Sequence, residues 1–139
     1  MAGVADLAAR AYPSLSGGER QRVHLARVLA QLMVRPGEYA GGYLLLDEPV
    51  TSLDPRHQHA ALVLTREFVG QGGAALAILH DVNLAARYAD RVLVLARGRA
   101  VAAGTPAEAL SPAVLGPVFD MNFRQIADPE GGPPIVLAA

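Results

Sequence analysis

The sequence of 139 residues contains no cysteine and no lysine, and all twelve basic residues are arginines. Without cysteine, disulfides and thiolate metal sites are excluded. A phosphate-binding loop of the form GxxxxGK[ST] needs its lysine to reach the β- and γ-phosphates, so this motif is absent from the sequence. No apolar run is long enough to cross a bilayer and no secretory signal opens the chain, so we expect a cytoplasmic protein.

The composition that remains favours a folded domain. Hydrophobic residues make up 52% of the chain, which is enough to build a buried core. The net charge is −1, whereas nucleic-acid binding usually requires a basic face. We therefore expect one modest domain, or part of a larger one, with no nucleic-acid partner.

Alternating strand and helix signals predict an α/β fold with parallel strands. The short apolar runs at 43–47 and 74–79 are typical of buried parallel strands that are covered on both faces. Residues 91–104 read as a hairpin around Arg97 and Gly98. The other expected elements are some helical potential at 5–11, helices at 16–33, 54–73, 83–89, 105–108 and 111–119, a loop at 35–42, and two short strands in the tail that are joined by a Pro/Gly turn.

Local signals mark where three of the helices begin. Ser16 and Glu19 have the spacing of a capping box, in which each side chain accepts a hydrogen bond from a free amide at the helix start. Thr105 begins a second box with the sequence TPAE. Asp54, followed by Pro55, is typical of a third helix start.

The segment LSGGE at residues 15–19 is the first feature that suggests chemistry. A helix N-terminus presents free amides and a partial positive charge, which suit an anion such as a phosphate. Gly17 and Gly18 allow close approach to the backbone, and the Ser16 hydroxyl adds a donor. The alternative interpretation is an ordinary capped helix that follows a turn.

The segment YLLLDEP at residues 43–49 is the second such feature. It places two carboxylates at the C-terminal end of an apolar strand, where α/β folds bind ligands. Asp47 can hold Mg²⁺ directly or through water, and Glu48 can orient and deprotonate a water molecule. The alternative is a pair of solvated acids that end a strand.

Taken together, four segments resemble the motifs of ABC-type ATPases. LSGGERQR is similar to the signature motif and YLLLDEP to the Walker B strand with its catalytic glutamate. TSLD at 51–54 is similar to the D-loop, and His80 in ILHD to the switch histidine. The four occur in the family's order, and the resemblance extends over nearly the whole chain.

The resemblance implies the C-terminal part of an ABC ATPase domain. Residues 1–36 would be the end of the helical subdomain with the signature helix, and 43–139 would run from Walker B to the end of the core. The P-loop, the adenine-stacking aromatic residue and the Q-loop glutamine would lie in a missing N-terminal half. A truncated gene, a misplaced start codon or a deliberately shortened piece would each explain this.

The resemblance also implies roles in binding and hydrolysing ATP with Mg²⁺. In a head-to-tail dimer, the signature residues would contact the γ-phosphate of ATP held by the second subunit. Glu48 and His80 would act on ATP held by the chain's own P-loop, and Asp47 would hold Mg²⁺. The signature residues are Leu15, Ser16, Gly17, Gly18 and Glu19, and the D-loop residues are Ser52, Leu53 and Asp54.

Less specific segments, among them LDPRHQH and LHDVNLAARYADRVLVLARGRAVAAGTPAEAL, resemble ATP-binding subunits of haem importers. Such a subunit would form a homodimer and dock on an integral membrane permease at the inner face of the cell membrane. A substrate-binding protein would be an indirect partner. Ferric-siderophore or cobalamin import, a non-transport ABC ATPase and an inactive fragment that only binds partners are the alternatives. Val50 departs from the family's usual threonine, and we expect little damage.

Three further histidines are candidates for ligands. His57 and His59 form an H-x-H pair, but positions i and i+2 of a helix point to different faces. We therefore interpret both as solvated surface and not as a metal or haem site. His24 lies on the signature helix and is interpreted as structural or surface.

Two arginines and the loop before the signature complete the set of candidates. Arg20 and Arg22 could add positive potential near a phosphate, but a solvated helix face is the preferred interpretation. Tyr12 and Pro13 could shape the loop before the signature, and ordinary packing is preferred.

Overall fold

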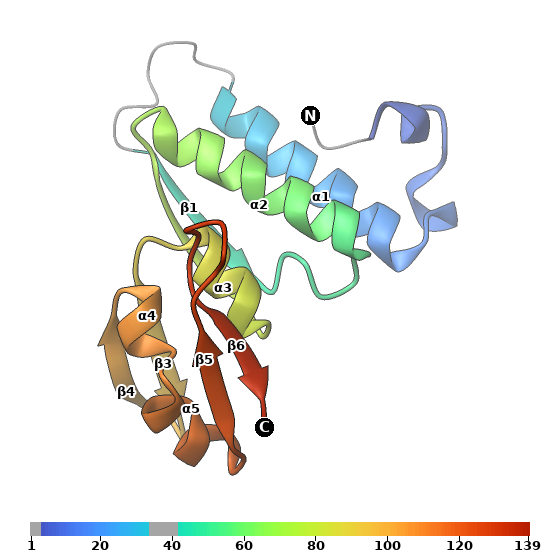
Figure 1. Ribbon diagram of the computed structural model, residues 1–139. Helices are drawn as coiled ribbons and strands as arrows, with labels where there is room; N and C mark the ends of the chain where they lie inside the picture. Colours follow the sequence, from blue (N-terminus) through green and yellow to red (C-terminus); the bar gives the residue numbers. More distant parts are fainter. Residues whose placement is uncertain (1–3, 34–41) are drawn as a thin grey trace. The chain divides into compact units, whose positions relative to one another are not determined.

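A computed structural model describes residues 4–33 and 42–139 (Figure 1). The chain divides into two compact units, residues 1–80 and 81–139, and each is described by itself. The predicted loop at 35–42 lies almost entirely outside the described residues. Among the described residues, no helix is long and apolar enough to cross a membrane.

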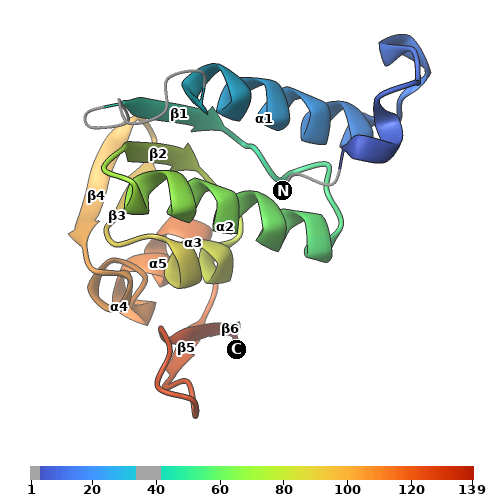
Figure 2. The same cartoon turned by 90° about the horizontal axis from the view of Figure 1, so that it is seen from above.

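The first unit contains two long helices and two parallel strands. Helix α1 (Gly17–Met33) lies beside α2 (Pro55–Gly70), as Figure 1 shows. Strands β1 (Tyr43–Asp47) and β2 (Ala74–Ile78) pair in parallel with Tyr43 opposite Ala74 and Asp47 opposite Ile78 (Figure 2). The α2 crossover between them confirms the predicted parallel α/β arrangement. The stretch before α1 forms two short 3-10 turns, η1 (Ala5–Leu7) and η2 (Tyr12–Ser14), where helical potential was expected.

The core of the first unit lies between the helices and one face of the two strands. Its buried side chains are Leu7, Leu15, Leu25, Leu44, Val50, Leu53, Ala61, Leu62 and Phe68. Along β1, Leu44 is buried while its neighbours Tyr43 and Leu45 are 79% and 75% exposed. Leu76 and Ile78 of β2 are also exposed. The prediction that both faces of these strands are covered is therefore wrong for the described residues, because Leu44 is the one buried residue of β1 and β2 has none.

The second unit follows the predicted order of elements. The antiparallel strands β3 (Val92–Ala96) and β4 (Arg99–Gly104) form the expected hairpin. Arg97 and Gly98 both have positive φ, 50° and 72°, which is the requirement of a tight two-residue hairpin turn. The other elements are α3 (Val82–Tyr88), α4 (Pro106–Ala109), α5 (Pro112–Phe119) and the antiparallel strands β5 (Phe123–Ile126) and β6 (Ile135–Ala138).

The second unit has a small core of its own. Ala86, Leu110, Leu115 and Val136 are buried together, and Phe123 packs against them. The Asn83 side chain joins helix α3 to the edge of β6. Its amide donates to the Val136 carbonyl at 3.0 Å, and its carbonyl accepts from the Val136 amide at 2.8 Å. One side chain thus satisfies both backbone groups of an edge residue.

Helix caps agree with the local sequence signals. Asp54 accepts a hydrogen bond from the His57 amide at the start of α2. Glu108 accepts from the Thr105 amide at 2.9 Å, as expected for the second capping box. Asp81, which was not predicted as a cap, accepts from the Asn83 and Leu84 amides at the start of α3.

Candidate functional site

Glu48 and His80 lie together at the C-terminal ends of the two parallel strands. The His80 Nε2 atom is 2.7 Å from Glu48 Oε1. A carboxylate can only accept, so the imidazole donates from Nε2. The Thr51 hydroxyl donates to the other oxygen, Oε2, at 3.1 Å. Asp47, the preceding residue, is exposed at the last position of β1. The parallel register places Asp47 opposite Ile78. Glu48 follows Asp47 and His80 lies two residues after Ile78, so this register brings Glu48 and His80 together.

The environment of Glu48 favours an ionised carboxylate. The hydrogen bond from His80, followed by that from Thr51, holds the pKa of Glu48 below its usual value. Glu48 also has a φ of 46°, a left-handed conformation that is uncommon for a residue with a side chain. The backbone therefore turns sharply after β1, and the side chains of Asp47 and Glu48 take different directions. Such a carboxylate is suited to accept hydrogen bonds from a polar ligand or a water molecule.

The predicted capping box opens α1. The Ser16 amide donates to Glu19 Oε2 at 2.7 Å, and the Glu19 amide donates to Ser16 Oγ at 3.3 Å. Arg10 donates to the other oxygen of Glu19 at 2.6 Å and to the Ser14 carbonyl at 3.1 Å. The backbone hydrogen bond from Ser16 is the main cause of a lowered pKa at Glu19. Because Ser16 Oγ accepts from Glu19, its own O–H can still donate outward.

A side chain of α1 contacts the loop that precedes this helix. Arg20 donates to the Pro13 carbonyl at 2.8 Å, and its guanidinium lies 5.8 Å from the centre of the Tyr12 ring. Tyr12 is 51% exposed. Both interpretations of Tyr12 and Pro13, ordinary packing and shaping of the loop, agree with these contacts. Arg20 is exposed, as expected for a solvated helix face.

Gly17 and Gly18 have different surroundings. A Cβ atom added at Gly17 would meet nothing within 4 Å. A Cβ atom added at Gly18 would lie 2.7 Å from the Ser52 carbonyl oxygen and 3.8 Å from the Leu53 side chain. The segment 51–54 thus packs against the first turn of α1 at Gly18, while Gly17 stays open. Leu15 is buried and anchors the start of the helix in the core.

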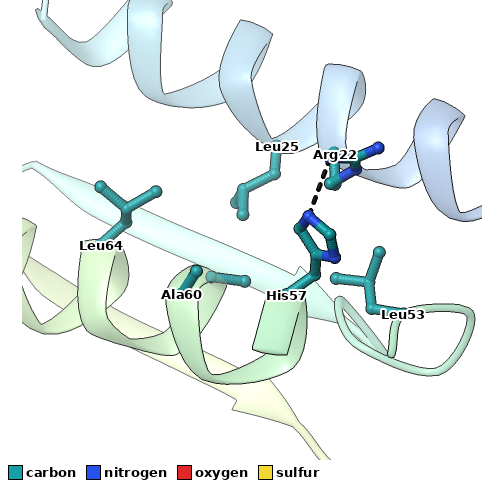
Figure 3. A pocket seen from close by; sticks show the side chains of 7 residues that line it. Arg22, Leu25, Leu53, His57, Ala60 and Leu64 are labelled. Carbon is teal, nitrogen blue, oxygen red and sulfur yellow. Dashed lines mark hydrogen bonds between the residues drawn. The ribbon is translucent and has the colours of Figure 1, made fainter. Parts of the chain in front are cut away.

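Asp54, His57 and Arg22 form a hydrogen-bonded chain between α2 and α1, shown in part in Figure 3. His57 Nδ1 is 2.7 Å from Asp54 Oδ2, and Arg22 Nη1 is 2.9 Å from His57 Nε2. The hydrogen bonds from His57 hold the pKa of Asp54 below its usual value. The interpretations of His57 and Arg22 as solvated surface are therefore wrong, because both side chains are part-buried and bonded across the helix pair.

The remaining candidates lie outside these clusters. His24 is exposed on α1, as expected. Among the described residues, no group of three or more His, Cys, Asp or Glu side chains could hold a metal ion by itself. Val50 is 5% exposed and belongs to the core. Its carbonyl accepts from Gln58 Nε2 at 3.2 Å, so the backbone of this segment is held from α2.

The predicted residues thus gather into two clusters within the first unit. One contains Glu48 and His80, with Asp47 adjacent in sequence. The other joins the start of α1 to residues 52–54. Sequence reasoning missed Thr51 and Arg10 as partners of Glu48 and Glu19. Thr51 lies three residues after Glu48, a spacing at which a hydroxyl can reach back in a turn, whereas no short-range signal points to Arg10.

Comparison with known proteins adds independent evidence. No family model matches the chain. It is 56% identical over 131 residues to the hemin import ATP-binding protein HmuV of Pseudomonas entomophila, covering 94% of this chain and 50% of that protein. It is 53% identical over 137 residues to HmuV of Pseudomonas aeruginosa, covering 99% of this chain and 52% of that protein. The chain spans about half the length of the curated relatives it matches.

Solved structures share the fold. An inward-facing ABC transporter described as of the metal-chelate type matches with a TM-score of 0.76 and 25% identity, covering 99% of this chain and 53% of that one. A dimeric ATP-binding cassette, MJ0796, bound to ADP and Pi in a post-hydrolysis state, matches with a TM-score of 0.56 and 28% identity, covering 68% of this chain and 37% of that one. The chain therefore has the sequence and the fold of the C-terminal half of an ABC-type ATPase domain.

Proposed function

We propose that the chain provides the C-terminal half of the ATP-hydrolysing subunit of a bacterial ABC importer for hemin. The observation that carries this proposal is the pairing of Glu48 with His80 at the ends of two parallel strands, 2.7 Å apart. The identity of 47–56% to hemin import ATP-binding proteins supports the cargo. The P-loop lysine that this sequence lacks would come from the part of the relatives' length that the chain does not span.

Glu48 would position the water that attacks the γ-phosphate. Its lowered pKa means that it holds a proton weakly, so it is better suited to orient a water by accepting its hydrogen bond than to store the proton. The proton can then pass on to the phosphate oxygens. His80, which donates to Glu48 here, would also contact the γ-phosphate and so fix the carboxylate relative to it. Most of the catalytic effect in such a site comes from positioning and charge.

Asp47 fits a role in holding Mg²⁺. Its carboxylate is exposed at the end of β1, and Mg²⁺ usually takes only one or two carboxylates together with waters and phosphate oxygens. The donor set therefore suits this ion even though no larger acidic cluster is found among the described residues. When bound, Mg²⁺ supplies positive charge that neutralises the phosphates.

The signature segment, made of Leu15, Ser16, Gly17, Gly18 and Glu19, would present Ser16 and Gly17 to ATP held by a second subunit. Ser16 keeps an O–H that can donate outward, and Gly17 is open to the approach of a phosphate. Glu19 is engaged by the Ser16 amide and by Arg10, so its role is to hold the helix start in shape. The dimeric state described for the similar cassette MJ0796 supports a homodimer.

The intact subunit would bind a membrane permease at the inner face of the cell membrane and, through it, serve a substrate-binding protein. ATP binding would close the dimer and hydrolysis would reopen it. Nucleic acid is not an expected partner, in line with the net charge of −1. The 139-residue chain alone is not expected to hydrolyse ATP, because it has no lysine to orient the β- and γ-phosphates.

A chimera tests the proposal directly. Residues 1–139 replace the matching half of the Pseudomonas aeruginosa hemin import ATP-binding protein, to which they are 53% identical. Growth on hemin as the sole iron source and ATP turnover of the purified chimera are measured. Both should be retained, and both should fail with Glu48→Gln. A folded chimera that shows neither activity would overturn the proposal.

One observation favours a second candidate, import of another metal chelate such as a ferric siderophore, or of cobalamin. The structural match to the metal-chelate type transporter extends over 99% of this chain. A hemin importer and an importer of another metal chelate would then share this half of the ATPase subunit and would differ in the permease. Growth of the chimera strain on hemin is therefore compared with growth of a strain whose metal-chelate importer carries the same replacement. Function with the metal-chelate permease alone would favour this candidate.

A further inference from the structure

Helix α1 presents one face to the segment that leads into α2. Gly18, Arg22 and Leu25 are spaced at i, i+4 and i+7, which places them on one helix face. At Gly18 the backbone approaches the Ser52 carbonyl. Four residues later, Arg22 reaches His57 at 2.9 Å. We propose that Arg22 and His57 are positioning residues that fix the 51–54 segment on α1 through the hydrogen-bonded chain Arg22–His57–Asp54.

The partners of His57 determine its protonation state. An arginine guanidinium can only donate, so Nε2 must accept from Arg22. A carboxylate can only accept, so Nδ1 must carry the proton and donate to Asp54. His57 is therefore neutral, with its proton on Nδ1. Either a second proton or the other tautomer would place two hydrogens between Arg22 and Nε2 and break the chain.

The surroundings of the ring favour a fixed orientation. Arg22 from α1 and Asp54 at the start of α2 are charged groups that contact His57. The pocket beside the ring is lined, besides Arg22 and His57, by Leu25, Leu53, Ala60, Ala61 and Leu64 (Figure 3). The Arg22–His57 bond is part-buried beside this apolar pocket, whereas the Asp54 side chain at the other end of the chain is 59% exposed. Asp54 is also the N-cap of α2, so one carboxylate holds both the helix start and the imidazole.

This inference rests on the proposed function. Signature and D-loop residues of one subunit would both face ATP in a closed dimer. Their relative position would therefore determine whether the phosphates bind in the orientation that hydrolysis needs. The Gly18–Ser52 contact fixes one point and the Arg22–His57–Asp54 chain fixes a second. The two contacts together fix the orientation of residues 51–54 on α1, whereas either contact alone would leave the segment free to rotate. Loss of the chain should therefore slow turnover more than it weakens ATP binding.

The first test measures the tautomer in the 139-residue chain. The ¹⁵N shifts of the His57 ring are recorded by long-range ¹H–¹⁵N NMR at neutral pH, with Arg22→Gln as the comparison. We expect a proton on Nδ1 in the parent chain and loss of that preference in the variant. A ring protonated on Nε2 alone, or on both nitrogens, would overturn the proposal. This result does not depend on ATP hydrolysis.

The second test uses the chimera described above. His57→Leu should lower kcat about tenfold to a hundredfold while KM for ATP changes little, and His57→Gln, which keeps a donor and an acceptor, should retain more of the rate. His59→Leu, on another face of α2, is the control. Equal rates for His57→Leu and the parent would overturn the proposal, whereas a chimera inactive in every form would refute the function and leave the NMR result standing.

Discussion

The two glycines at the start of α1 allow a matched comparison. In Gly18→Ala the new Cβ atom lies 2.7 Å from the Ser52 carbonyl oxygen, about 0.7 Å inside the 3.4 Å at which ordinary contacts begin. The oxygen belongs to the backbone and cannot rotate away as a side chain would. Overpacking of this kind costs about 1–3 kcal/mol of the free energy of unfolding.

Gly17→Ala is the control because its Cβ atom meets nothing within 4 Å. Both variants gain about 0.4–1 kcal/mol because alanine lowers the conformational entropy of the unfolded chain relative to glycine. This shared gain cancels in the difference between them. Gly17→Ala is therefore expected to be neutral or stabilising, and Gly18→Ala should be less stable than Gly17→Ala by about 1–3 kcal/mol.

The measurement is urea unfolding of the two variants and the parent at one temperature, with the slopes compared to confirm that the same surface is exposed on unfolding. Hydrogen exchange at residues 51–54 provides a local readout, because the contact at Ser52 should loosen in Gly18→Ala alone. If Gly18→Ala proves as stable as Gly17→Ala and its exchange is unchanged, the approach of Ser52 to Gly18 is not a real constraint on this chain.

Three further predictions concern other parts of the molecule. In the chimera, Glu48→Gln should slow ATP hydrolysis strongly and let ATP-bound dimers accumulate in size-exclusion chromatography, since a neutral amide, with one acceptor oxygen and two N–H donors, orients the attacking water less well than a carboxylate; a variant that stays monomeric with ATP would contradict this role. Asn83→Ala should lower the free energy of unfolding by about 1–3 kcal/mol, because both backbone groups of Val136 lose their partner. Thermal unfolding measures this, and an unchanged midpoint would contradict a stabilising role of the Asn83–Val136 hydrogen bonds. Hydrogen bonds from Thr105 lower the pKa of Glu108 in the folded chain below the ordinary value of 4.5. The stabilisation by this carboxylate is then present above about pH 4.5 and lost as pH falls through the lowered pKa, so unfolding of Glu108→Gln should depend less on pH below 5 than that of the parent.

The sequence by itself determined the elements whose signals are local. Capping boxes join residues three positions apart, so Ser16 with Glu19 and Thr105 with Glu108 are visible as short patterns and are found in the structure. The parallel pairing of 43–47 with 74–78 follows from two apolar runs separated by a helix. The order of the four motifs likewise needs no coordinates, and it led to the resemblance that the comparisons confirm.

Other features were determined only by the tertiary structure, because they join residues that no local rule connects. Arg22 and His57 are 35 positions apart, and each was interpreted alone as solvated surface. Their pairing exists because α1 and α2 pack side by side and bring one turn of each helix together (Figure 1). In the same way, the need for glycine at position 18 was attributed to a phosphate, whereas the backbone of Ser52 already requires it. A spacing rule describes one element at a time, and a contact between two elements depends on how their faces meet.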